Sequence, residues 1–320
     1  MIQRRLALLL PLLAAPLIAH AQPYPSKPVR VIVPFAPGGP ADVLARVIGQ
    51  ELSDALGQPF VVENKVGAAG NIGVEQIAKA MPDGYTAGIV PVGNVAVNPS
   101  LFPALPYKAS ELAPIAMLAT VENVLVVHAG VPAKSLKELL ALAKQKPGTM
   151  TYGTTGPGTI QRIATEYFAG IAGIKLVHVP YRGANETTTA ILAGEIDITI
   201  NGMSNILPHI EGGKLKALAI STLTRHRLAP GSPTMQEAGV AGYSSQGAFG
   251  LFAPAGVAPE IRAKIHADTA EILKRPDVVK ALEDRSFQVD NVGPDGFAKM
   301  IAAETEKWAK VIRAANIKGD

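Results

Sequence analysis

Two glycine-rich turns hold the residues of this sequence whose types and spacing suit the binding of an anion. The first turn, Pro34–Asp42 (PFAPGGPAD), and the second, Thr154–Thr159 (TTGPGT), each join a β-rich run to a helical window. Glycine lets backbone N–H groups approach a bound group closely, and the start of a helix favours a negative charge. The threonines add hydroxyl donors. Two such turns that face each other would hold one carboxylate, or one at each end of a diacid.

Each turn, taken by itself, also fits a tight turn with a helix cap. Asp42 lies just inside a helix start, where it would stabilise the helix dipole as readily as it would contact a ligand. Arg182, which follows a later strand, would form a bidentate pair with a carboxylate or lie solvated at the surface. Neither turn matches the phosphate-binding patterns GxxxxGKS/T and GxGxxG. One such turn in each of the two predicted units of the chain favours ligand binding.

The sequence contains no set of residues with the spacing of a catalytic or metal site. Its six histidines are scattered outside any HExxH pattern, no serine lies in GxSxG, and there is no cysteine. We therefore expect no enzymatic activity, no metal and no cofactor. A formal net charge of +4, with only 5% aromatic residues and no dense basic patch, argues against nucleic acid as a partner.

Alternating strands and helices must position the two turns. Short β-rich runs at Val29–Val33, Phe60–Glu63 and Tyr85–Pro91 alternate with helical windows, and a second series begins at the strand Asn123–His128. This repetition predicts an α/β protein whose mostly parallel sheet has helices on both faces. Ligands of such sheets bind outside the carboxyl ends of the strands, often in a cleft.

The order of these elements predicts one domain inserted into another. Residues 22–122 and 228–320 would form a discontinuous first α/β domain, and residues 123–227 the inserted second one. The chain begins with Arg4 and Arg5, an apolar stretch at Leu6–Ala19 and a small-x-small site at Ala19–Ala21. This pattern is typical of a cleaved signal peptide, here residues 1–21. We therefore expect a periplasmic protein, and we expect it to be a monomer.

A series of short stretches, all in one order, resembles the tripartite tricarboxylate transporter substrate-binding proteins, also called the Bug family. The resemblance covers essentially the whole chain from about Tyr24 onward, and it implies the type II periplasmic binding protein fold, with a ligand cleft between two α/β domains. The stretches are PFAPGGPADVLAR, ENKVGAAGNIG, DGYT, VNPSLF, YGTTGPGT, VPYRGA, LAGEID, GKLKALAIST and GLFAPAGV.

The resemblance implies a protein that captures a small organic carboxylate, either a di- or tricarboxylate or an aromatic acid. Its partners would be the membrane permease subunits of a tripartite tricarboxylate transporter. A receptor that presents its ligand to a membrane sensor kinase would need the same binding chemistry and stays open as the alternative. A hydrolase or isomerase on the same fold would need a nucleophile and base that the sequence lacks, and a purely structural protein would bind no ligand.

The resemblance also predicts site residues, because in the family two loops from opposite domains hold a carboxylate, partly through water. Arg182 joins them as a possible carboxylate partner, and Asn201 joins them as a position of specificity. The full predicted set is Phe35, Ala36, Gly38, Gly39, Asp42, Gly93 and Asn94 in the first domain, and Thr154, Thr155, Gly158, Thr159, Arg182, Gly183, Ala184 and Asn201 in the second.

Four positions depart from what is usual in the family. Arg162 stands where a histidine is usual and Glu186 where a proline is usual. Asn201 replaces a common aspartate, and Ala248 replaces an aromatic residue, often tryptophan. The last two changes would widen or neutralise the far end of the pocket. We therefore expect a bulkier or less amino-acid-like ligand, such as an aromatic acid.

Overall fold

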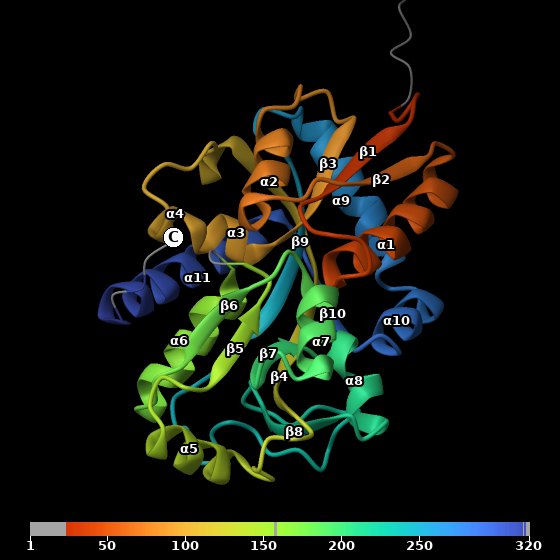
Figure 1. Cartoon of the computed structure of the whole chain (residues 1–320). Helices are drawn as coiled ribbons and strands as arrows, with labels where there is room; N and C mark the ends of the chain where they lie inside the picture. Colours follow the sequence, from red (N-terminus) through yellow and green to blue (C-terminus); the bar gives the residue numbers. More distant parts are fainter. Residues whose placement is uncertain (1–23, 157–158, 316, 318–320) are drawn as a thin grey trace, which may run out of the picture.

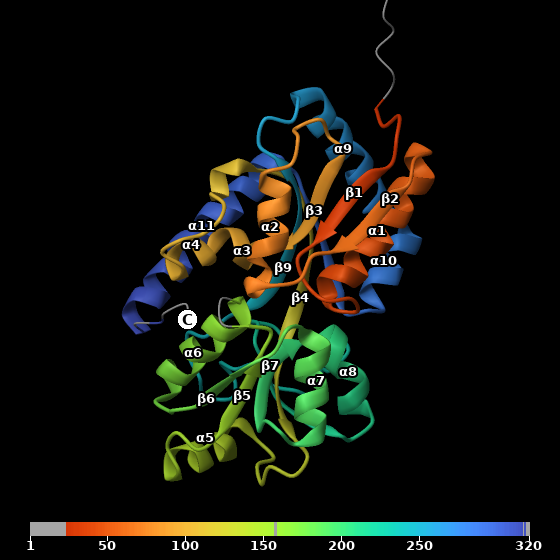
Figure 2. The ribbon, with the colours of Figure 1, turned by 45° about the horizontal axis from the view of Figure 1, so that its top comes forward.

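The chain folds into two lobes that are connected through a long central strand (Figures 1 and 2). The computed structural model describes residues 24–156, 159–315 and 317, so the expected signal peptide lies outside the described residues. Within these ranges no helix combines the length and the apolar character that a membrane crossing requires.

The first lobe is built on parallel strands with helices on both faces. β1 (Val29–Val33) lies between β2 (Phe60–Asn64) and β3 (Thr86–Pro91), and both pairings are parallel, as predicted. Antiparallel strands β9 (Gln246–Pro254) and β10 (Phe287–Val292) extend the sheet. The helical elements are α1 (Pro40–Leu56), η1 (Ala68–Gly70), α2 (Asn71–Ala78), α3 (Val92–Ala96), α4 (Asn98–Leu101), η2 (Ala109–Glu111), α9 (Pro259–Ile272), α10 (Pro276–Glu283) and α11 (Pro294–Ala315).

Two apolar cores cover the two faces of this sheet. Leu44 of α1 packs with Ile265 of α9 on one face, and Ile77 of α2 packs with Phe297 of α11 on the other. Because both faces are covered, β1 is almost continuously apolar, and only Arg30 is exposed along it. The carboxyl ends of β1 and β3 therefore point from a rigid layer towards the second lobe (Figure 2).

The second lobe repeats this plan on a smaller scale. β5 (Thr151–Thr154) pairs in parallel with β6 (Val177–Pro180) and β7 (Ile198–Gly202), while β8 (Leu215–Ile220) runs antiparallel to the central strand. The helices are α5 (Leu136–Gln145), α6 (Ile160–Ala172), α7 (Ala184–Ala193) and α8 (Met203–Glu211). The sheet is thus mixed and not mostly parallel as predicted. The strands at the lobe junction pair in the antiparallel sense, β9 with β3 and the central strand, and the central strand with β7 and β8.

The central strand β4 (Leu112–His128) belongs to both lobes. Its first part pairs with β9 as far as Glu122, and from Asn123 it pairs with β7 and β8. We predicted only the part from Asn123, and this was wrong: the strand is 17 residues long. Its first part was not predicted because buried and exposed residues do not alternate along it and because it contains Pro114. That proline lies where the pairing with β9 shifts register, a position that tolerates the missing N–H.

The return crossing lies close to β4 in space. Met235, Val240 and Tyr243 pack in the core of the second lobe, although they follow the expected boundary at residue 227. The Ser245 N–H then donates to the Ser221 carbonyl at 2.9 Å, immediately before β9 begins. We propose on this basis that the second lobe extends to Ser245.

An apolar cluster joins the lobes on one side of the molecule. Ile163 and Ala164 of α6 pack against Leu101 of α4 and Trp308 of α11. The Trp308 ring also meets Tyr167 edge-on, with 6.2 Å between the ring centroids. α11 thus packs both against a core of the first lobe and against α6 of the second lobe.

Replacement of Trp308 by alanine should lower the free energy of unfolding by about 3–5 kcal/mol, because it removes a large side chain that is 1% exposed and contacts both lobes. Urea unfolding followed by circular dichroism measures the change. Lys299→Ala, an exposed site on the same helix, is the matched control and should shift stability by less than about 0.5 kcal/mol. Equal stability of the Trp308 variant and the control would contradict this account of the cluster.

Candidate ligand-binding site

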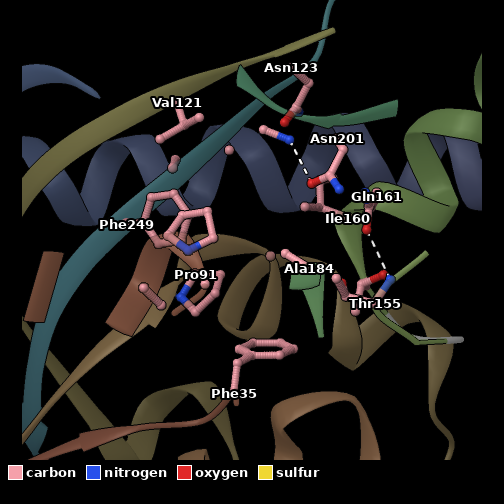
Figure 3. A pocket seen from close by; sticks show the side chains of 18 of the residues that line it. Phe35, Pro91, Val121, Asn123, Thr155, Ile160, Gln161, Ala184, Asn201 and Phe249 are labelled. Atoms are coloured by element: carbon pink, nitrogen blue, oxygen red, sulfur yellow. Dashed lines mark hydrogen bonds between the residues drawn. The ribbon is translucent and has the colours of Figure 1, made fainter. Parts of the chain in front are cut away.

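A cavity of about 110 Å³ lies between the lobes, at the carboxyl ends of the parallel strands (Figure 3). One water needs on the order of 10–15 Å³ by the same measure, so the cavity has room for a small organic molecule. Residues of both lobes line it: Phe35, Ala36, Gly39, Pro40, Ala41, Pro91, Gly93, Asn94, Val121, Asn123, Thr155, Thr159, Ile160, Gln161, Ala184, Asn201, Gly202, Gly247, Ala248 and Phe249.

Helix starts from opposite lobes meet at this cavity. α1 begins after Gly39, α6 after Thr159 and α7 after Gly183, and none of these three residues caps its helix with a side chain. The first N–H groups of a helix have no partner within the helix, and the dipole makes this end attractive to anions. Ala41 at the start of α1 and Ala184 at the start of α7 both line the cavity. The arrangement therefore favours a negatively charged group bound by backbone donors.

The lining contains no aspartate, glutamate, lysine, arginine or histidine within the part of the chain that the structure describes. Its polar groups are amide and hydroxyl side chains, and its apolar part includes Phe35, Val121 and Phe249. Figure 3 shows Phe249, Val121 and Pro91 on one side of the cavity and Gln161 and Thr155 on the other. A ligand with an anionic end and an apolar body matches this division.

Asp42 holds the first turn in shape and does not line the cavity. Its carboxylate accepts hydrogen bonds from the Gly38 N–H, from Asn64 and twice from Arg46, each at 2.9 Å. Burial alone would raise the pKa of Asp42, but these hydrogen bonds outweigh it and hold the pKa below its ordinary value. The Gly38 N–H is consequently occupied, and of the predicted first-turn residues Phe35, Ala36 and Gly39 reach the cavity.

Gln161 plays the corresponding part in the second turn. Its Oε1 accepts a hydrogen bond from the Thr155 N–H at 2.9 Å, and its Nε2 donates to the Ile200 carbonyl at 2.6 Å. The buried Thr154 hydroxyl bonds to Gly156 and His178 instead of facing the cavity. The Thr155 side chain lines the cavity, and its hydroxyl makes no hydrogen bond with any other residue described by the structure.

The remaining predicted residues divide between the cavity wall and its surroundings. Thr159, Ala184, Gly93, Asn94 and Asn201 line the cavity, and Gly158 lies outside the described residues. Gly183 does not line it but forms the N-cap of α7. Arg182 is exposed and lines a separate outer hollow between the lobes.

Of the four residues that depart from the family pattern, two line the cavity and two do not. Arg162 is buried in α6 beside Tyr152 and does not line the cavity. The Glu186 carboxylate accepts the Arg182 N–H at 3.0 Å and so ties the preceding turn to the first turn of α7. Asn201 and Ala248 do line the cavity. Asn201 is tied down, because its Oδ1 accepts the Gly202 N–H at 2.8 Å.

Several lining residues were missed by the sequence prediction, above all Gln161, Asn123 and Phe249. Gln161 lies two residues after a predicted site residue, so the turn itself pointed to it. Asn123 is the polar first residue of an otherwise apolar run, which is a weak indication of a site. Phe249 follows Ala248 in a Gly-rich segment, and nothing in the local sequence distinguishes it from a core residue.

The first turn also contacts α7 directly. The Asn185 Nδ2 donates to the Pro37 carbonyl at 3.1 Å, across the two lobes. Gly38 has a φ of 79°, and a Cβ atom there would lie 2.6 Å from that same Nδ2. Glycine at this position is therefore required both by the left-handed backbone and by the close approach of the lobes.

Comparison with known proteins places the chain among receptors of membrane transport. The sequence model of the tripartite tricarboxylate transporter family receptors matches residues 44–317. BugT of Bordetella pertussis is 36% identical over 308 residues, which cover 96% of this chain and 94% of BugT. Among solved structures, a Rhodopseudomonas palustris protein with adipate has a TM-score of 0.89 and 31% identity, and covers 92% of this chain and 99% of its own. MatC from the same species with bound malate has a TM-score of 0.86 and 30% identity, with coverages of 90% and 100%.

These solved structures confirm the predicted fold class. Structures of a periplasmic transporter and of the periplasmic binding protein BugD also match this chain over more than nine-tenths of its length. The matching proteins consist of two α/β domains. Within the described ranges, no group of three or more acidic or histidine side chains is placed to hold a metal ion.

Asp42→Ala should lower the free energy of unfolding at neutral pH by about 1–3 kcal/mol, because it removes the acceptor of two part-buried hydrogen bonds, from the Gly38 N–H and the Asn64 amide. Since the pKa of Asp42 is lowered in the folded protein, its stabilisation is complete above the ordinary value of 3.8. The difference between wild type and variant should therefore be constant from about pH 5 to 8, and shrink as the pH falls through the lowered pKa. Urea unfolding across this pH series measures it.

Asp54→Ala, at an exposed position of the same helix, serves as the control and should change stability by less than about 0.5 kcal/mol. A difference for Asp42→Ala that widens towards acid pH would show that the carboxylate is not the stabilising form.

Proposed function

The chain belongs to the tripartite tricarboxylate transporter family of receptors, and on this premise we propose that it is a periplasmic protein that captures a small organic carboxylate between its two lobes. The observation that carries the proposal is the meeting of uncapped helix starts from both lobes at one cavity without charged side chains. Residues 1–21 would be the signal peptide that directs it to the periplasm.

The carboxylate is proposed to lie between the starts of α1, α6 and α7. Backbone N–H groups near Gly39 and Ala184 would donate to its oxygens, together with the Thr155 hydroxyl. Hydrogen bonds to an ionised acceptor are roughly twice as strong as neutral ones, so a few neutral donors are enough to hold the anion. Asp42 and Gln161 would act indirectly, by fixing the two turns.

The lining also limits the class of ligand. An ammonium group would be buried without any carboxylate to pair with, because none of the described lining residues is acidic. Phe35 and Phe249 offer apolar contact to the body of a ligand. The related proteins were solved with adipate and with malate, both dicarboxylates without an amino group. We therefore propose a carboxylate that carries no amino group, which includes aliphatic diacids and aromatic acids.

Binding is proposed to stabilise the closed arrangement of the lobes, which permease subunits would then recognise. The lobes are linked by β4 and by the return crossing at Ser245, so a change of angle needs only local rotation at these two crossings. A ligand that contacts Gly39 and Ala184 together gains both sets of contacts only when the lobes are closed. No bond in the ligand needs to break, and unchanged ligand should be recovered after incubation.

Isothermal titration of the protein against adipate, malate, benzoate, glutamate and adipamide, the neutral diamide of adipate, tests the class of ligand. We expect at least one of the three amine-free acids to bind, and glutamate and adipamide to bind far more weakly. Thr155→Val keeps the shape but removes a donor to the anion, so it should weaken binding roughly 10- to 100-fold. Thr149→Val, an exposed threonine of the same lobe, is the control and should bind as the wild type does.

Equal affinity for adipate and adipamide would refute an anion site at the helix starts. Preferential binding of glutamate would refute the proposed class of ligand while leaving the carboxylate site intact.

A further inference from the structure

Asn123 differs from the other amide side chains that line the cavity. Asn94 Nδ2 donates to the Ala69 carbonyl at 2.8 Å, and both ends of Gln161 and of Asn201 have partners. Asn123 is only 9% exposed, and its side chain makes no hydrogen bond to any residue in the described part of the chain. Neither its nitrogen nor its oxygen is among the fully buried atoms without a partner, so the amide is open to the cavity, with its donors and its acceptor unused.

An amide without a partner is unusual in this part of β4. Val124, Leu125 and Val126 follow it, and all are completely buried. Polar side chains in such surroundings are normally hydrogen-bonded. Buried polar groups that break this rule concentrate at functional sites. The backbone of Asn123 already serves the fold, because its carbonyl accepts the Ser221 N–H at 2.8 Å.

The position of Asn123 separates it from the proposed carboxylate site. It lies at the point where β4 passes from the first lobe to the second, and pairs there with Gly202. In Figure 3, Asn123 and Asn201 lie together at one end of the view, whereas Thr155 and Phe35 lie towards the other. A molecule that reaches Asn123 from the helix starts must therefore span the cavity and carry a polar group at both ends.

We propose that Asn123 is a specificity-determining residue that binds a second oxygen-bearing group of the ligand, a carboxylate, carbonyl or hydroxyl. This inference rests on the proposed function and narrows it to bifunctional acids. The amide donates from Nδ2 and accepts at Oδ1, so it satisfies each of these groups but gives nothing to a methyl end. An acid with an apolar end would leave the amide buried and unpaired, which penalises its binding.

The test compares acids of equal chain length with and without a second oxygen-bearing group. Adipate is matched with hexanoate, and malate with butyrate, which lacks both the second carboxylate and the hydroxyl; each is titrated against wild type, Asn123→Leu and Asn123→Ala. We expect the wild type to prefer the bifunctional acid of at least one pair by about 10- to 100-fold. Asn123→Leu should remove most of this preference, because the bifunctional acid loses a partner and the monocarboxylate no longer buries an unpaired amide.

Stability without ligand distinguishes this role from a structural one. Because the amide makes no hydrogen bond within the described part of the protein, the melting temperature of ligand-free Asn123→Leu should not fall below that of the wild type. Thr120→Val is the matched control on the same strand, since Thr120 is buried and does not line the cavity. It should leave the preference between the paired acids unchanged.

Each outcome decides the matter. Retention of the full preference in both Asn123 variants would overturn the inference and leave the carboxylate site standing. A clear fall in melting temperature in both variants would show that Asn123 serves the fold, and this too would overturn it. Failure of the wild type to bind any carboxylate would overturn the proposed function itself.

Discussion

The structure depends on one constraint: backbone N–H groups at the starts of helices from both lobes end at the same small cavity. A helix start has donors that the helix cannot satisfy, and donors away from water need an acceptor from elsewhere. Neither Gly39 nor Thr159 nor Gly183 supplies one from its own side chain. Under the proposed function, the carboxylate of the ligand supplies this acceptor from between the two lobes.

Charged side chains in this protein shape the site and stay out of contact with the cavity. Asp42 and Arg46 pair behind the first turn, and Glu186 ties the Arg182 turn to the helix that follows it. The cavity itself is lined by amides, hydroxyls and apolar groups. Such a lining distinguishes an anion from its neutral amide through hydrogen bonding, and it offers no partner for a cationic group.

The two sides of the lobe junction are built differently. On one side, Trp308 and Ile163 form a dry apolar contact between α11 and α6. On the other, the contact between the first turn and α7 is polar, a hydrogen bond from the exposed Asn185 to Pro37. Apolar packing resists separation, whereas an exposed polar contact exchanges with water at little cost. Opening of the cleft should therefore be easier on the Asn185 side, with β4 and α11 near the axis.

Although it did not predict α3, α4, α8 or β10, the sequence alone predicted most of the helices and strands, where the two glycine-rich turns lie, and which family the chain resembles. These depend on local patterns: apolar periodicity, turn chemistry and helix starts act over a few residues. The prediction went wrong where local pattern is silent, as in the non-alternating first half of β4 with its Pro114.

Only the tertiary structure decided which turn residues face the cavity and which hold it in place. Asp42 and Gln161 are both polar residues near a glycine-rich turn, and the sequence does not show which of them faces the cavity. The Asp42 carboxylate accepts hydrogen bonds behind the first turn, away from the cavity. The Gln161 amide lines the cavity and bonds to the second turn. Asn123 entered the site because a strand passes from one sheet to the other at that residue. Such placements follow from contacts between residues far apart in the chain, and no local pattern records them.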